Sequence, residues 1–94
     1  MSNKAEPNAS AERRLALGLA VRHWVNFEGG TEVEREIATA RSYATFLDGG
    51  GNDAAAVALR VEMLMLAAAA QSDPSGNVAR AEQLLRYVET GCSP

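Results

Sequence analysis

Three breaks rich in glycine or proline divide this chain into four segments, and this division constrains the fold more than any other feature. The breaks are Gly29-Gly30, "DGGG" from residue 48 and "QSDPSGN" from residue 71. The glycine runs lack the lysine and the preceding strand of a phosphate-binding loop, so they are interpreted as helix stops. No stretch alternates apolar and polar residues with the period of two that a half-buried strand shows. The sequence therefore predicts an all-α fold, a compact antiparallel bundle of four helices with short connections.

The first segment predicts a helix over residues 11–28, with Asn8 or Ser10 as its N-cap. Its apolar residues cover most of the helix circumference and leave only a narrow polar sector. A helix of this kind is normally buried on more than one side.

The second segment has the clearest start, because "TEVE" from Thr31 to Glu34 has the form of a capping box. Its apolar residues then recur at spacings of 4, 3, 4 and 3, which predicts a heptad-type packing seam about two heptads long. Tyr43 and Phe46 are expected to flank this seam. The seam residues are Val33, Ile37, Ala40, Ala44 and Leu47.

The third segment, "AAAVALRVEMLMLAAAA" over residues 54–70, follows Asn52 or Asp53 as N-cap and contains only two charges, Arg60 and Glu62. It is short for a membrane span. Two central charges would also cost roughly 2.5 to 3.5 kcal/mol each on an insertion scale. We therefore predict that this segment is the central helix of a soluble bundle.

The fourth segment predicts an amphipathic helix that begins at Asp73-Pro74 or at Asn77 and ends at Gly91. The chain shows no repeat with a period of about 20 to 50 residues, and it lacks the tryptophan, glycine and tyrosine positions of the tetratricopeptide motif. No family is assigned on this basis. The expected organisation is one domain over residues 10–91, with a flexible tail over 1–9 and a short tail over 92–94.

Apolar residues are more abundant than one small bundle can bury. They make up 47% of the chain, and the first and third segments are apolar over most of their surface. A bundle of this length has room for at most one fully enclosed helix, so the surplus predicts a partner. We expect homodimerisation through these two helices. The residues expected at a protein interface are Leu17, Val21, Trp24, Arg60, Glu62, Met63 and Met65.

Several of these interface residues also have an alternative interpretation. Trp24 is equally well suited to the core or to an interface. Met63 and Met65, at helical spacing in an apolar segment, are more often core residues than parts of an adaptable groove. Arg60 and Glu62 point in different directions, and they either lie at a solvated rim or fix the register at a subunit interface.

Candidate catalytic and metal-binding groups are scarce. The chain has one histidine, His23, and a metal site needs several converging ligands. Leu19 and Phe27 lie one turn before and one turn after it, so we expect a hydrogen-bonded histidine at the edge of the core. Cys92 has no histidine near it in the sequence, and no nucleophile, base and orienting group are brought together. We expect no enzymatic activity, no cofactor and no metal.

Charge and cysteine content restrict the partners and the compartment. The net charge is −3, and the arginines are scattered, which argues against binding to nucleic acid or to a membrane surface. A single cysteine excludes an intrachain disulfide framework. The polar N-terminal stretch lacks the apolar region of a signal peptide, so we expect a cytoplasmic protein. The preference for arginine over lysine, with many alanines, is typical of a GC-rich bacterial or phage genome.

The function that these observations favour is that of a small non-catalytic protein-interaction module. It would act through apolar helix faces as an adaptor, a chaperone or an inhibitor of a larger complex. The alternatives are a small dimeric nucleic-acid-binding regulator and an accessory subunit of an enzyme. Salt-dependent retention on duplex DNA would favour the first alternative. Loss of an activity in His23→Ala without loss of folding would favour the second.

Overall fold

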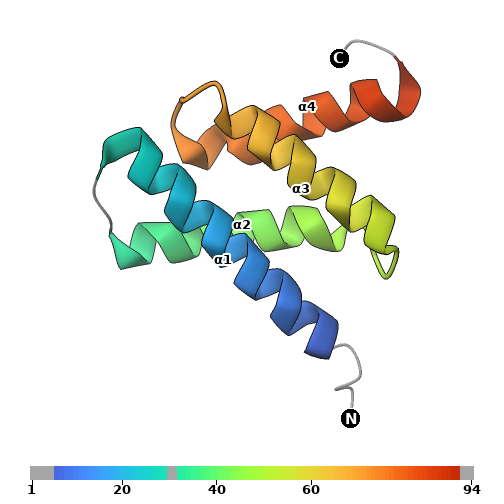
Figure 1. Ribbon diagram of the computed structural model, residues 1–94, viewed down its shortest axis with the longest axis horizontal. Coiled ribbons are helices and arrows are strands. Elements are labelled where there is room, and N and C mark those ends of the chain that lie inside the picture. The colour runs from blue at the N-terminus through green and yellow to red at the C-terminus, as the bar shows by residue number, and fades with distance from the viewer. Residues whose placement is uncertain (1–5, 30–31, 92–94) are drawn as a thin grey trace.

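The computed structural model describes residues 6–29 and 32–91, and this part of the chain is all-α (Figure 1). The prediction of four helices joined by short connections is confirmed. A short 3₁₀ helix, η2, precedes the last of them. The elements are α1 (Glu6–Glu28), α2 (Val33–Asp48), α3 (Ala54–Ala68), η2 (Pro74–Gly76) and α4 (Asn77–Thr90).

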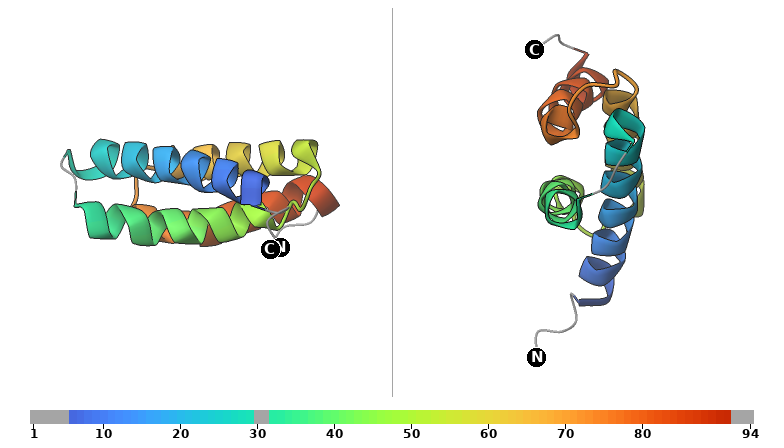
Figure 2. Two further views of the ribbon diagram at one scale, coloured as in Figure 1. Left: turned by 90° about the horizontal axis from the view of Figure 1, so that it is seen from below. Right: turned by 90° about the vertical axis from the view of Figure 1, so that its left-hand side faces the viewer.

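The four helices form two antiparallel hairpins that lie side by side in two layers. α1 packs on α2, and α3 packs on α4. Figure 2 shows α1 and α3 together in one layer, with α2 and α4 in the other. The molecule is flat, with principal extents of 40 × 36 × 15 Å. Helical solenoids stack helix pairs in the same way, and a hairpin at the end of such a stack has one side that no other helix covers.

Two of the expected helix starts differ from the structure. α1 begins at Glu6, because proline at position 7 is tolerated in the first turn of a helix. Asn8 and Ser10 therefore lie inside α1, and the prediction that either one is its N-cap is wrong. The N-cap of α2 is Glu32, whose side chain makes no capping hydrogen bond. Thr31, the expected cap of that helix, lies outside the described residues.

The start of α3 was predicted correctly, whereas Asp73-Pro74 begins η2 and the N-cap of α4 is Gly76. Asp53 is the N-cap of α3, and its carboxylate accepts hydrogen bonds from the amides of Ala55 and Ala56 at 3.0 and 3.3 Å. Asp73 caps η2, with proline in the first turn. The same Asp73 carboxylate accepts hydrogen bonds from Ser75, which hold the pKa of Asp73 below its usual range.

The buried core draws on all four helices and is rich in alanine. Tyr43, Leu47 and Leu64 are its largest fully buried hydrophobic side chains. Small residues allow the helix axes to approach closely, so few large side chains are needed to fill the space. The buried alanines are Ala16, Ala20, Ala40, Ala67 and Ala81.

The prediction of which face of α2 packs against the rest of the protein is partly wrong. Of the heptad-type seam, Ala40 and Leu47 are buried, whereas Val33 is 66% exposed and Ile37 is 40% exposed. Tyr43, expected to flank the seam, is fully buried. The reason is that α1 crosses α2 at an angle (Figure 1), so the covered stripe of α2 is turned away from the first half of the seam.

α3 is also less enclosed than its composition predicts. Met63, Leu64 and Ala67 are buried, but Met65 and Leu66 are half exposed. A two-layer arrangement covers one side of each helix, which is why the prediction of a central, enclosed third helix is wrong.

No helix in residues 6–29 and 32–91 is long and apolar enough to cross a membrane.

In the turn between α2 and α3, alanine substitutions of two neighbouring glycines are expected to lower the stability of the protein by different amounts. A Cβ at Gly50 would lie 2.9 Å from the backbone nitrogen of Val57, which cannot move without shifting α3. A Cβ at Gly49 would meet the flexible end of the Arg60 side chain at 2.8 Å. We expect Gly50→Ala to lower the free energy of unfolding by about 1 to 3 kcal/mol. Gly49→Ala should cost clearly less in the same urea titration, and equal losses would contradict this account.

Candidate functional site

A hydrogen-bonded chain of three buried polar side chains joins the two hairpins. Tyr43, on α2, lies at its centre. Its hydroxyl oxygen is 2.7 Å from Nδ1 of His23, on α1, and accepts a hydrogen bond from Nδ2 of Asn77, on α4, at 2.9 Å. The prediction of a hydrogen-bonded histidine at the core edge is confirmed, since His23 is buried and partnered.

The surroundings of His23 favour a neutral imidazole. Because Asn77 donates to the Tyr43 oxygen, the phenol O–H is available to donate to His23 Nδ1. In the arrangement in which Tyr43 donates, Nδ1 of His23 is the acceptor and the proton of the neutral ring lies on Nε2. Burial lowers the pKa of His23, and the nearby Arg22 guanidinium lowers it further. Burial raises the pKa of Tyr43, and the hydrogen bond from Asn77 acts in the opposite direction.

The lowered pKa of His23 predicts a loss of stability on mild acidification. At a pH well above about 6.5, the histidine is neutral in both the folded and the unfolded chain, and it makes no pH-dependent contribution. Below that pH the unfolded chain binds the proton first. The free energy of unfolding should therefore fall as the pH decreases from about 7 through the lowered pKa of the folded state. Urea titrations at several pH values test this, and a slope between pH 7 and 5.5 that persists in His23→Gln would contradict it.

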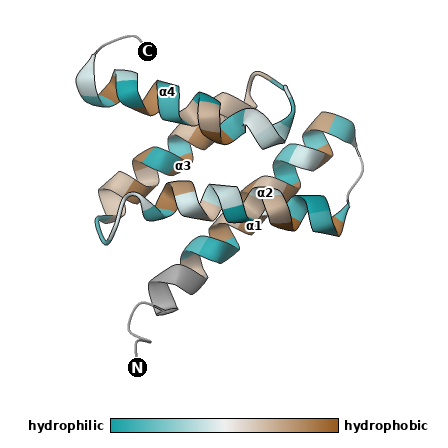
Figure 3. Ribbon diagram, turned by 180° about the vertical axis from the view of Figure 1, so that it is seen from behind, coloured by the Kyte–Doolittle hydropathy of each residue, from teal (hydrophilic) through white to brown (hydrophobic). Residues whose placement is uncertain are grey.

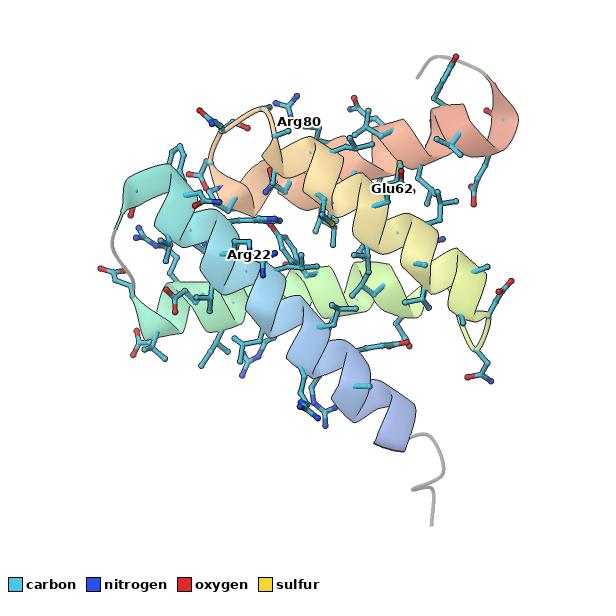
Figure 4. All side chains as sticks on the ribbon, viewed as in Figure 1. Arg22, Glu62 and Arg80 are labelled. Atoms are coloured by element: carbon cyan, nitrogen blue, oxygen red, sulfur yellow. The ribbon has the colours of Figure 1, made fainter. Side chains whose placement is uncertain are left out.

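Two hollows lie beside this hydrogen-bonded chain. His23, Asn26 and Gln71 border both a cavity of about 30 Å³ and an open groove of about 390 Å³ between α1 and α3. Arg22, labelled in Figure 4, lies at the edge of the groove. Oδ1 of Asn77, which lines the cavity, is buried without a partner among the described residues. Among these same residues, no group of three or more histidine, cysteine, aspartate or glutamate side chains could hold a metal ion.

Trp24 lies in the core and is fixed from two sides. Its indole Nε1 donates to Oγ1 of Thr39 at 2.8 Å. The guanidinium carbon of Arg35 lies 4.1 Å from the centroid of the Trp24 ring, a cation–π contact, and Arg35 also forms an ion pair with Glu28. These contacts join the end of α1 to the start of α2.

The other predicted interface residues are divided between core and surface. Met63 is buried, and Val21 is half-buried. Leu17, Met65 and Glu62 are exposed, with Glu62 shown on α3 in Figure 4.

Arg60 has a role within the chain that the sequence did not reveal. Its Nη1 donates to the carbonyl oxygen of Phe46 at 3.1 Å, and its guanidinium lies over the Phe46 ring. It thus satisfies a carbonyl group in the last turn of α2, where a positive charge also interacts favourably with the helix dipole.

An apolar hollow lies on the uncovered side of the first hairpin and is called here the α1–α2 groove. It has a volume of about 570 Å³. Leu17, on its α1 side, lies on the opposite face of that helix from Leu15 and Arg22, which border the hollows toward α3. Figure 3 shows hydrophobic residues interspersed with hydrophilic ones along α2. The residues that line the α1–α2 groove are Arg13, Leu17, Ile37, Ala40, Arg41, Ala44 and Thr45.

Charge and exposure distinguish the α1–α2 groove from the rest of an acidic chain. Leu17 and Ile37 are 42% and 40% exposed. Arg13 and Arg41 border them, no carboxylate is among the lining residues, and neither arginine forms an ion pair with a described side chain. Of the residues that line the groove, only Leu17 was among the residues predicted for the interface. The heptad-type spacing of Ile37, Ala40 and Ala44 was the signal that could have found it.

Comparisons of this chain with protein-family models, with curated proteins and with solved structures found no match.

Proposed function

We propose that this chain is a non-catalytic protein-interaction module that binds another protein through the α1–α2 groove. The observation that carries the proposal is the pair of exposed side chains Leu17 and Ile37, which border a floor of two alanines on the uncovered side of the first hairpin. Contiguous apolar surface is costly to leave in water and commonly marks a binding site. Adaptor, chaperone and inhibitor are all roles that such a module could serve. No observation favours nucleic-acid binding or an enzyme-subunit role over this one.

The first test compares capture of partners by the wild-type chain and by Leu17→Glu/Ile37→Glu. A carboxylate at each position should remove binding without unfolding the protein, because both side chains are already substantially in solvent. Met65→Glu/Leu66→Glu is the matched control, with two apolar side chains of similar exposure on α3. A protein retained by the wild type and by the control, and lost from the groove variant, supports the proposal. Equal retention by all three, with circular dichroism showing each to be folded, contradicts it.

A further inference from the structure

The two hollows beside His23 form one continuous recess between the hairpins, called here the His23 recess. The cavity of about 30 Å³ is the inner end of the open groove of about 390 Å³, because the two share four lining residues. The cavity has room for one group of the size of a water molecule, such as an amino group. A ligand would place a small polar end group in the cavity and its other atoms in the groove. The shared lining residues are His23, Asn26, Ala68 and Gln71.

The inner end of the His23 recess offers a buried hydrogen-bond acceptor. Asn77 is 1% exposed, and its Nδ2 donates to the Tyr43 hydroxyl oxygen. Oδ1 of Asn77 is buried without a partner among the described residues, and Asn77 lines the cavity. A buried acceptor that lacks a donor is unfavourable, so an N–H or O–H group placed in the cavity would be bound selectively. This atom therefore points to a ligand that brings a donor.

The imidazole of His23 offers the complementary group. Its ring lines both hollows, and its Nδ1 is occupied by the Tyr43 hydroxyl. Nε2 is thus the ring nitrogen left for a ligand. In the neutral ring with its proton on Nε2, this nitrogen donates to an acceptor such as a carbonyl oxygen. An end group that carries both an N–H donor and a carbonyl acceptor, as a primary amide does, matches the pair formed by Asn77 and His23.

Gln71, at the boundary between cavity and groove, has an unusual backbone conformation. Its φ is 58°, and within residues 6–29 and 32–91 it is the only residue other than glycine with a positive φ. Glycine takes this conformation without strain, so a glutamine here indicates a use for its side chain. Its side-chain amide forms no hydrogen bond with another described residue and borders both hollows. It is therefore available to a ligand.

The open end of the His23 recess carries a positive charge. Arg22 borders the groove and forms no ion pair with a described side chain. No carboxylate is among the lining residues of either hollow, and Glu62, on α3, lies apart from Arg22 (Figure 4). An anionic group is therefore favoured at this end. An ammonium group is not favoured at the inner end, because no carboxylate there would compensate for its loss of hydration.

We propose that the His23 recess binds a small anion whose other end is a primary carboxamide. The amide nitrogen donates to Oδ1 of Asn77, the amide carbonyl oxygen accepts from Nε2 of His23, and the anionic group pairs with Arg22. The recess lies on the opposite face of α1 from Leu17 and the α1–α2 groove. The inference therefore goes beyond the proposed function and does not depend on it.

Linear carboxylates of increasing length that carry a primary amide at the far end test the inference. Binding to the isotope-labelled full chain is followed by NMR, through the side-chain amide signals of Asn77 and Gln71. The control ligands are the corresponding methyl ketones, in which a methyl group replaces the amide nitrogen and removes only the donor. We expect an amide of suitable length to shift these signals at about millimolar concentration. Its ketone should bind about tenfold or more weakly.

Two substitutions separate binding from folding. Gln71→Gly removes the backbone strain, so the melting temperature should stay the same or rise. The same substitution should weaken the amide ligand by about threefold or more, because a hydrogen-bonding side chain is lost. Arg22→Gln should also weaken this ligand and should reduce the dependence of its affinity on salt. Arg86→Gln, which alters an arginine outside the recess, should change neither quantity.

Three results would overturn the inference. Equal binding of amide and ketone would show that the oxygen of Asn77 does not select a donor. Unchanged Asn77 signals with every amide of the series would show that the inner end of the recess takes up water only. Full affinity in both Gln71→Gly and Arg22→Gln would place the ligand elsewhere. None of these measurements involves Leu17 or Ile37, so failure of this inference leaves the proposed function to its own test.

Discussion

Replacing Leu47 with alanine is expected to lower the free energy of unfolding by about 2 to 5 kcal/mol. Leu47 is fully buried within a core to which all four helices contribute. The truncation removes buried methyl groups and leaves a cavity that the surrounding side chains fill only in part. Because the core contains many alanines, few neighbouring side chains are long enough to move into that space. Urea unfolding followed by circular dichroism measures the loss.

The control for Leu47→Ala is Leu17→Ala, the same substitution in the α1–α2 groove. Leu17 is already 42% exposed, so its truncation should cost less than about 1 kcal/mol. Both variants remove the same atoms from a leucine, so the difference between the two losses of stability reflects only the burial of the position. Similar losses at both positions would mean that the groove is covered by the chain itself, in conflict with the described packing.

Replacing Tyr43 with phenylalanine is expected to cost about 1 to 3 kcal/mol, although it removes a single oxygen atom. That oxygen accepts the hydrogen bond from Asn77, and the same hydroxyl group is hydrogen-bonded to Nδ1 of His23. Without it, a buried amide N–H and a buried imidazole nitrogen lose the partner that they share. The loss reflects these unpaired groups rather than a change in packing volume.

Tyr87→Phe is the matched control for Tyr43→Phe, because Tyr87 is 60% exposed on α4. Water can solvate the neighbours of its hydroxyl, so the expected change is within about 0.5 kcal/mol. A double-mutant cycle with His23→Ala should show that the effects of losing His23 and Tyr43 are not additive, since the two share one hydrogen bond. Equal effects of the two tyrosine substitutions would refute the role assigned to Tyr43.

Local signals in the sequence were sufficient to predict the helices but not to predict how the helices pack. The glycine and proline breaks predicted the number of helices, and the short polar side chain of Asp53 predicted one start correctly. The periodicity of α2 indicated a seam for a helix, but spacing alone does not say whether that helix belongs to the same chain. The apolar composition of α3 likewise did not indicate that a two-layer fold covers only one of its sides.

The buried polar chain could be predicted only in part. His23 was expected to be hydrogen-bonded because it lies between two apolar residues on one helix face. Its partner Tyr43 also accepts a hydrogen bond from Asn77, which is 34 residues away from Tyr43 in sequence, and these two residues meet only when the two hairpins come together. A pairing that depends on the packing of whole hairpins leaves no signature within a local sequence window.

The most direct test of the central claim is site-specific photo-crosslinking from Ile37 in cells that produce the protein naturally. A photoreactive residue at this position in the α1–α2 groove should crosslink to a distinct second protein. The same residue in place of Tyr87, which is exposed on the other hairpin, should not crosslink to that protein. The account predicts this difference between the two positions. Crosslinks from Ile37 only to further copies of the chain, or the same products from both positions, would contradict it.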